Sequence, residues 1–400
     1  MVEDQLQEDS VNRFTVGAGS NSIARERSIS RRRFLWDVAR TTVATSVFGM
    51  RGLGQSSHLS LSASKLVVVT FGGGARDEET FAPEGQRYIP RMLGELIPQA
   101  SFFTQVMNRG ILGHYVANAS LATGCYESFN NFTPIPPGNP TLFEYYRRER
   151  AIRADDVWVV APSNGFDQIG ASNHVGYGSN LGATMVLPKQ LLRGLAKGNS
   201  STFDHLMMDS YEDTARVSLS KQRAVTLAAL AGRLDLSEDK FLAYASTVTS
   251  PDELSLYIAQ HLMARVAPKL LWITLHDIDV AHAGAYSLYT DAITRTDRIC
   301  ADLWKGIQSN PEYAGKTSMF ILPDFGRDSD FEAGGNGFQH HRTGDALSRT
   351  TWMLALGPGI RENVAIDRMV ESIDLVPTLA AILGCNAAFA KGRPLAEVLQ

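Results

Sequence analysis

Five short runs of continuously apolar residues set the strongest limit on how this chain can fold. The runs read LVVVTF, VWVVA, LLWITL, SMFIL and WMLAL, at 66–71, 157–161, 270–275, 318–322 and 352–356. A strand that is buried on both faces has such a continuous run, whereas a half-exposed strand alternates. Amphipathic helical patterns lie between the runs, at 141–150, 221–233, 253–266 and 286–307. The alternation predicts an α/β fold, with a doubly wound, mostly parallel sheet flanked by helices.

Two segments stand apart from this rhythm. Residues 1–60 are rich in Ser, Arg, Gln and Gly, and the rest, 61–400, carries the strand and helix patterns. Within 61–400, the stretch at about 165–250 has no clear strand–helix alternation. We therefore expect an α/β domain over 61–400, with a cap inserted at about 165–250 that covers the site.

The amino-terminal segment contains SRRRFL at 30–35, followed by a weakly apolar stretch at 38–50. This pattern resembles a twin-arginine signal, which the twin-arginine translocase reads when it exports folded proteins. It predicts an exported protein, periplasmic or extracytoplasmic, whose partner during export is that translocase. The alternative is a basic tail with no role in transport.

Charge and cysteine content exclude several classes of protein. With 38 basic and 42 acidic residues the net charge is −4, which argues against a nucleic-acid-binding protein. No run of 18 or more apolar residues occurs, so we expect no permanent membrane span. The three cysteines are widely spaced, which argues against a disulfide framework and a cysteine-zinc site. Any metal must therefore be bound by histidines and carboxylates.

Acidic and histidine side chains gather directly after the apolar runs. The first run continues into GGGARDE, the third into HDIDVAH and the fourth into PDFGRD. In open parallel sheets, binding sites form where the carboxyl ends of the strands meet. These three loops are therefore expected to share one edge of the sheet.

Four pieces of the chain offer ligands for a metal. Asp279 and His282 lie in HDIDVAH, and a carboxylate beside imidazoles suits Zn, Mn or Fe. Asp324 follows the fourth run, where a simple turn residue is an equal alternative. His340 and His341 are adjacent, so in an extended loop they point opposite ways and one of them is expected to bind. The Gly72–Gly74 turn, with Asp77 and Glu78 nearby, is the fourth piece, and a tight turn without a ligand explains it equally well.

Taken in order, these motifs resemble the alkaline phosphatase/sulfatase superfamily of metallohydrolases. The resemblance rests on SLATG at 120–124, PTLFE at 140–144, DIDVAH at 277–282, PDFGRD at 323–328, HHRTGD at 340–345, GPGI at 357–360 and DLVPTLAAILG at 374–384. It implies an alkaline phosphatase-like fold over about 65–400. It also implies a metal-dependent hydrolase or transferase that acts on small anionic phosphate or sulfate esters. The implied cofactor is a divalent metal, with Zn first and Mn, Fe or Ca as alternatives.

The sequence departs from the family pattern in three places. Gly72 stands where the family has its first metal-binding Asp, Phe325 replaces a second-metal His, and His114 lies near the place of the nucleophile. The metal ligands expected here are Asp279, His282, Asp324 and the pair His340 and His341, with His114 and Arg327 as catalytic residues and Asn118 and Arg76 binding substrate. The alternative function is that of a catalytically degenerate member that serves as a binding or envelope protein.

Overall fold

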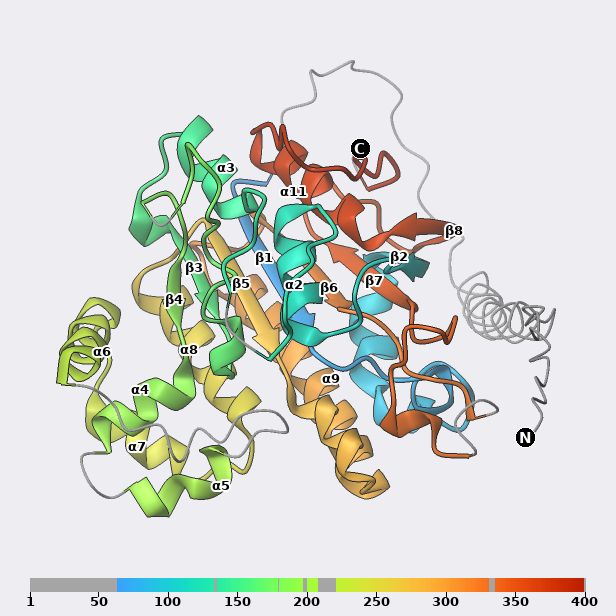
Figure 1. The fold of residues 1–400 in the computed structure, drawn as a ribbon, viewed down its shortest axis with the longest axis horizontal. Coiled ribbons are helices and arrows are strands. Elements are labelled where there is room, and N and C mark those ends of the chain that lie inside the picture. Colours follow the sequence, from blue (N-terminus) through green and yellow to red (C-terminus); the bar gives the residue numbers. More distant parts are fainter. Residues whose placement is uncertain are drawn as a thin grey trace, which may run out of the picture.

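The computed structural model describes residues 63–132, 135–178, 180–196, 200–207, 221–330 and 335–398. The twin-arginine motif at 30–35 lies outside them. The central feature is an eight-stranded sheet with the order β4-β3-β5-β1-β6-β7-β2-β8, which crosses the whole molecule (Figure 1). The strands are β1 (Lys65–Phe71), β2 (Ala100–Met107), β3 (Val157–Val160), β4 (Thr184–Val186), β5 (Leu270–Leu275), β6 (Thr317–Pro323), β7 (Thr350–Leu356) and β8 (Val364–Glu371).

The sheet is mostly parallel, as the sequence predicts. Strand β7 runs antiparallel to its neighbours β6 and β2, and every other neighbouring pair is parallel. The five apolar runs form β1, β3, β5, β6 and β7, which confirms the predicted class. Strands β2, β4 and β8 are additional to those runs.

Helices cover both faces of the sheet, and alternate residues of β1 enter two separate cores. Val67 and Val69 pack with α8 (Pro251–Arg265) and α9 (Tyr286–Ser309). Leu66 and Val68 face the other way, towards the core that includes three further helices. These helices are α2 (His114–Thr123), α3 (Leu142–Glu149) and α11 (Leu375–Leu383), which lie in front of the sheet in Figure 1. Burial on both faces explains why the central strands are continuously apolar.

The stretch expected to form a cap is partly built into the sheet. Its strand β4 pairs with β3 at one edge. Beyond that edge lie four helices, at the lower left of Figure 1: α4 (Pro188–Leu195), α5 (Asp204–Met207), α6 (Lys221–Leu234) and α7 (Glu238–Ala245). Leu192 and Phe241 of these helices are buried in the same core as α8. The division into a domain and an inserted cap stays a prediction. Among the described helices, none is both long and apolar enough for a bilayer crossing.

Candidate metal centre

Three loops that carry polar residues meet where the carboxyl ends of the central strands lie. Strand β1 lies between β5 and β6, and all three run parallel, so their carboxyl ends are side by side. Gly72 follows β1, His276 follows β5 and Asp324 follows β6. A 3₁₀ helix, Asp277–Ala283, begins directly after His276 and brings two further candidate ligands to this edge. The sequence prediction that these loops share an edge is confirmed.

Four side chains converge at this edge. Among the described residues, ligand atoms of His114, Asp279, His282 and His341 all lie within 4.8 Å of one another. Asp279 Oδ1 is 3.0 Å from His114 Nε2 and 3.1 Å from His282 Nε2. The Nε2 atoms of His282 and His341 are 2.8 Å apart. One carboxylate and three imidazoles form a donor set that suits a transition metal such as zinc.

Two features of the cluster fit a cation. His341 Nδ1 lies 3.0 Å from the Leu112 carbonyl oxygen, and donation to that oxygen leaves Nε2 with a lone pair facing the cluster. Burial lowers the pKa of His341 to about 2, helped by the positive charges of His114 and Arg327. Asp279 Oδ2 is buried and has no hydrogen-bond partner among the described residues. A neutral imidazole and an unsatisfied carboxylate oxygen are the groups that a divalent ion binds.

His114 begins helix α2 and lies between two carboxylates. Its Nδ1 is 2.8 Å from Asp324 Oδ2, and its Nε2 faces Asp279. Burial alone would lower the pKa of His114, but the two carboxylates outweigh it and raise that pKa to about 10. A carboxylate behind one ring nitrogen is also the usual support of a metal-binding histidine. The structure therefore adds His114, predicted as a catalytic residue, to the candidate metal ligands.

Asp324 lies behind His114, outside the group of four. Its side chain is fully buried and accepts hydrogen bonds from the Gly73 amide at 3.3 Å and from Asn118 Nδ2 at 3.3 Å. Burial raises the pKa of Asp324. Asn118 is also buried; it donates to the His114 carbonyl oxygen at 2.9 Å and accepts from Thr70 at 2.7 Å. Both residues orient His114 here, and their roles as metal ligand and substrate-binding residue stay predictions.

The two arginines expected to bind or activate substrate have protein partners. Arg327 is 1 % exposed and donates to the Gly74 and Phe338 carbonyl oxygens and, at 3.0 Å, to Asp279 Oδ1. Arg76 pairs with Glu79 and Asp330. Arg327 therefore holds a candidate metal ligand, whereas the guanidinium group of Arg76 is held by two carboxylates outside the group of four. The catalytic role of Arg327 and the substrate-binding role of Arg76 stay predictions.

The adjacent histidines separate as the alternation argument expects. His341 joins the cluster, whereas His340 is exposed and lies outside the group of four. The assignment of His340 as a ligand therefore has no geometric support in this structure.

Comparison with known proteins identifies the architecture. No family model and no curated protein matches the chain. Among solved structures, the chain is similar to the alkaline phosphatase PafA, with a TM-score of 0.53 and 11 % identity over 84 % of this chain and 99 % of that one. It is also similar to a protein in the alkaline phosphatase superfamily from Vibrio parahaemolyticus, with a TM-score of 0.50 and 11 % identity over 85 % and 71 %. A putative sulfatase from Bacteroides thetaiotaomicron gives a TM-score of 0.50 and 12 % identity over 83 % and 74 %.

The fold is that of the alkaline phosphatase superfamily. At this level of identity the likeness concerns the fold, so the chemistry of the centre must be argued from its own residues.

In this chain with an alkaline phosphatase-like fold, rings fill the space beside the group of four, around Gly72 and His114, which is called the packed half of the centre. A Cβ atom at Gly72 would lie 2.5 Å from His276 Cδ2, so the His276 ring occupies the space that a longer side chain at Gly72 would need. Phe325 is fully buried and stacks on the His114 ring, with centroids 4.8 Å apart and planes at 20°. At Gly72 and Phe325, where the sequence differs from the family pattern, aromatic rings therefore fill the available space.

Two buried carboxylates, neither predicted from the sequence, fix the backbone on either side of the centre. Asp252 of α8 accepts the amides of His276 at 2.8 Å and Asp277 at 2.9 Å. Burial, together with the charge of Asp277, raises the pKa of Asp252 to about 8. Asp328 accepts the Arg342 amide at 2.6 Å and so holds the residue next to His341. In the sequence both carboxylates look like ordinary cap or turn residues, which gives no signal of this role.

Proposed function

We propose that the chain is a metal-dependent hydrolase or transferase that acts on phosphate or sulfate esters. The observation that carries the proposal is the convergence of His114, Asp279, His282 and His341, whose ligand atoms lie within 4.8 Å of one another. Their position at the carboxyl ends of parallel strands, in an alkaline phosphatase-like fold, supports it further. A divalent ion held by these residues, with Zn first and Mn, Fe or Ca as alternatives, would supply a Lewis acid for an anionic ester.

The chain's own residues prepare the centre in three ways. Arg327 fixes Asp279 through Oδ1, so the carboxylate keeps one orientation. Asp324 and Asn118 fix the ring and the backbone of His114. The imidazole of His114 can hold a proton between two carboxylates or present Nε2 to a cation.

The hydroxyl group of Ser120 has a structural role. Ser120 Oγ donates to the Val116 carbonyl oxygen at 2.9 Å and accepts the Glu127 amide at 2.9 Å. This hydroxyl therefore supports the end of α2, and the proposed nucleophile is a water molecule rather than Ser120.

A second function is favoured by the packed half of the centre. The rings of His276 and Phe325 fill the region where the family resemblance implies further metal ligands. A catalytically degenerate protein that binds ligands in the cell envelope would retain the fold in this form.

Metal content and turnover separate the two functions. We expect one metal ion per chain after purification, together with turnover on a panel of aryl phosphates and aryl sulfates. Full metal content without turnover on any member of the panel would favour the binding protein. Absence of metal, even after incubation with Zn, Mn, Fe and Ca salts, would contradict the proposed centre.

We also propose that the chain is exported in its folded form by the twin-arginine translocase. SRRRFL at 30–35 and the weakly apolar stretch that follows support this proposal. Replacement of Arg31 and Arg32 by Lys should retain the protein in the cytoplasm in a fractionation experiment. The same change at Arg25 and Arg27 is the matched control, and equal export of both variants would contradict the proposal.

A further inference from the structure

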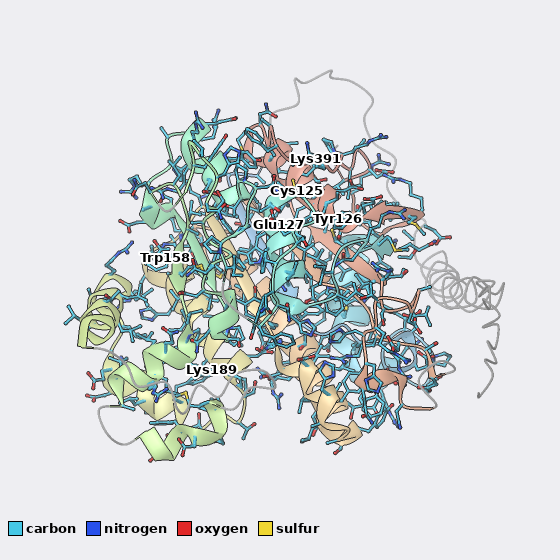
Figure 2. All side chains as sticks on the ribbon, viewed as in Figure 1. Cys125, Tyr126, Glu127, Trp158, Lys189 and Lys391 are labelled. Atoms are coloured by element: carbon cyan, nitrogen blue, oxygen red, sulfur yellow. The ribbon has the colours of Figure 1, made fainter. Side chains whose placement is uncertain are left out.

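A cavity of about 510 Å³ lies beside the metal centre, on the cap side. Its wall includes Pro162 after β3 and His276 after β5, so it also opens at the carboxyl edge of the sheet. Lys189 of α4 and Thr249, before α8, contribute from the region beyond the sheet. Figure 2 labels Lys189 on the α4 side of the molecule. The volume is typical of pockets that bind small organic molecules, which span roughly 300–1,000 Å³.

The 3₁₀ helix Asp277–Ala283 separates this cavity from the metal centre. A 3₁₀ helix has three residues per turn, so side chains three apart lie on one face. Asp277, Val280 and Ala283 line the cavity. Asp279 and His282 belong to the metal centre. The third face, Ile278 and Ala281, is buried in the core. One short segment thus presents one face to the metal centre and another to the cavity.

The two sites also share a side chain. His276 lines the cavity, and its Nε2 lies 3.6 Å from Asp279 Oδ2 in the metal centre. An ester could therefore place its reacting end at the metal centre and its organic part in the cavity. Only the His276 side chain would lie between the two parts.

The charges that line the cavity balance. Lys189 and Arg295 are cationic, and Asp277 and Asp291 are anionic. Lys189 is 3 % exposed and carries three hydrogen-bond donors. Arg295 Nη1 donates to Asp277 Oδ2 at 2.9 Å, and Ser250 donates to the same carboxylate. Among the described residues, the charged lining therefore consists of two cationic and two anionic side chains, of which Arg295 and Asp277 are hydrogen-bonded to each other.

Aliphatic side chains line the cavity beside these polar ones. Val280 and Ala283 lie on the same face of the 3₁₀ helix as Asp277, and Leu288 and Ala292 come from α9, which also carries Asp291 and Arg295. A ligand that matches this mixed lining has apolar ring carbons and several hydroxyl groups that both donate and accept hydrogen bonds. A strongly anionic ligand would meet Asp277 and Asp291, and a purely apolar one would cover polar side chains of the lining without offering them hydrogen bonds.

We propose that this cavity binds a neutral, polyhydroxylated ring, which forms the alcohol part of the ester whose anionic end reacts at the metal centre. The proposal rests on the proposed function for the reacting end. Binding of the ring itself needs no metal, because none of the four candidate ligands lines the cavity.

Ligand-detected NMR on the full chain in the presence of a metal chelator tests the ring-binding step. The probes are methyl α-glucoside, methyl α-galactoside, methyl α-mannoside and myo-inositol, with cyclohexanol and benzoate for comparison. We expect at least one polyol to bind. Its Kd should rise at least tenfold in Lys189→Met, which removes the ammonium group, and in Ala283→Trp, which fills the cavity from the 3₁₀ helix.

Two control variants carry the same substitutions outside the cavity, one that removes a lysine charge and one that adds a tryptophan side chain. Lys240 and Ala243 are exposed residues of α7 that do not line the cavity, so Lys240→Met and Ala243→Trp should leave the Kd unchanged. Circular dichroism and thermal melting check each variant. Because Ala283 is exposed, Ala283→Trp decides the outcome if the buried Lys189→Met fails to fold.

The outcomes separate this proposal from the proposed function. The cavity proposal is overturned if none of the polyols binds, if benzoate or cyclohexanol binds as tightly, or if the two cavity variants bind like the wild type. Polyol binding by a metal-loaded protein that does not cleave phosphate or sulfate esters of the same polyols would contradict the hydrolase function alone. Turnover of aryl esters without polyol binding would overturn the cavity proposal alone.

Discussion

The two halves of the centre lie at the same edge of the same sheet, yet one is polar and the other is packed. Asp279, His282 and His341 bring ligand atoms together, and Asp279 Oδ2 has no hydrogen-bond partner in the part of the chain that the structure describes. On the other side, the rings of His276 and Phe325 fill the space around Gly72 and His114. The difference teaches that polar side chains can converge on one side of His114 while aromatic rings pack tightly on the other. His114, which touches both halves, links them.

The largest expected effect is loss of metal from the polar half. His282→Ala removes an imidazole that lies 3.1 Å from Asp279 and 2.8 Å from His341, so metal content should fall at least tenfold. Elemental analysis after dialysis against zinc measures it. His340→Ala is the matched control and should retain full metal, because His340 is exposed and outside the cluster. Full metal content in both His282→Ala and a His340/His341 double variant would refute the shared site.

A carboxylate placed in the packed half should destabilise the protein. Gly72→Asp puts Cβ 2.5 Å from the His276 ring, and overpacking of this kind costs about 1–3 kcal/mol of unfolding free energy. Urea denaturation measures the change, and Gly94→Asp is the control because a Cβ there would meet none of the described residues within 4 Å. The double variant with His276→Ala should show favourable coupling. If Gly72→Asp is as stable as the wild type, the His276 ring does not block this half.

Asp297, a buried carboxylate outside the centre, has a raised pKa, whereas the pKa of Asp279 is lowered. Asp297 of α9 accepts the amides of Arg91 at 3.0 Å and Met92 at 2.7 Å, but burial outweighs these bonds and raises its pKa to about 6. The folded state therefore holds a proton between about pH 4 and 6 that the unfolded chain has released. This contribution to stability is complete below about pH 4 and is lost as the pH rises through 6.

Asp297→Asn removes the titration. The difference in unfolding free energy between variant and wild type should change in favour of the variant by about 2 kcal/mol between pH 4 and 7, from urea denaturation at each pH. A difference that stays constant over this range would mean that burial does not shift Asp297. By contrast, the pKa of Asp279 is held well below its usual range, because His114 and His282 outweigh its burial.

The smallest effect is expected behind the centre, at Ser120. Ser120→Ala removes two hydrogen bonds of 2.9 Å and should cost about 1 kcal/mol of unfolding free energy, with metal content unchanged. Ser309→Ala, at an exposed serine of α9, is the control and should change stability by less. Loss of turnover in a fully folded, metal-loaded Ser120→Ala protein would instead identify this hydroxyl as the nucleophile.

The central part of the fold was predictable because burial on both faces leaves an unmistakable pattern. Strands β1, β5 and β6 are almost wholly apolar, and the loops that follow them carry the ligands. Strand β8 gives no such pattern because it is an edge strand, where Met369 is 48 % exposed and Asp367 and Arg368 interrupt the apolar residues. Strand β4 is three residues long, and β2 contains Ser101, Thr104 and Gln105. These three segments form strands because they pair with neighbouring strands in the folded sheet, and their own residue patterns do not indicate it.

The same limit applies to the site. Asp279 and His282 are close in the sequence, so a local motif identifies both. His114 reaches Asp279 from 165 positions away, and only the packing of α2 against the sheet brings it there. Asp252 and Asp328 act through backbone amides of other segments, and such a contact leaves no trace in the pattern of residue types. For His340 and His341, alternation predicted that one would bind, and the fold determines which.

The 3₁₀ helix Asp277–Ala283 also restricts how this protein can evolve. Each residue of a 3₁₀ helix advances the chain by a third of a turn. Insertion or deletion of one residue ahead of His282 would rotate it away from Asp279 and turn a core residue or a cavity residue towards the metal centre. Changes in length should therefore be absent between Asp279 and His282 in any homologue that keeps the metal. New ligand preferences would arise by substitution at Val280 and Ala283, whose face can vary while the ligand face stays in register.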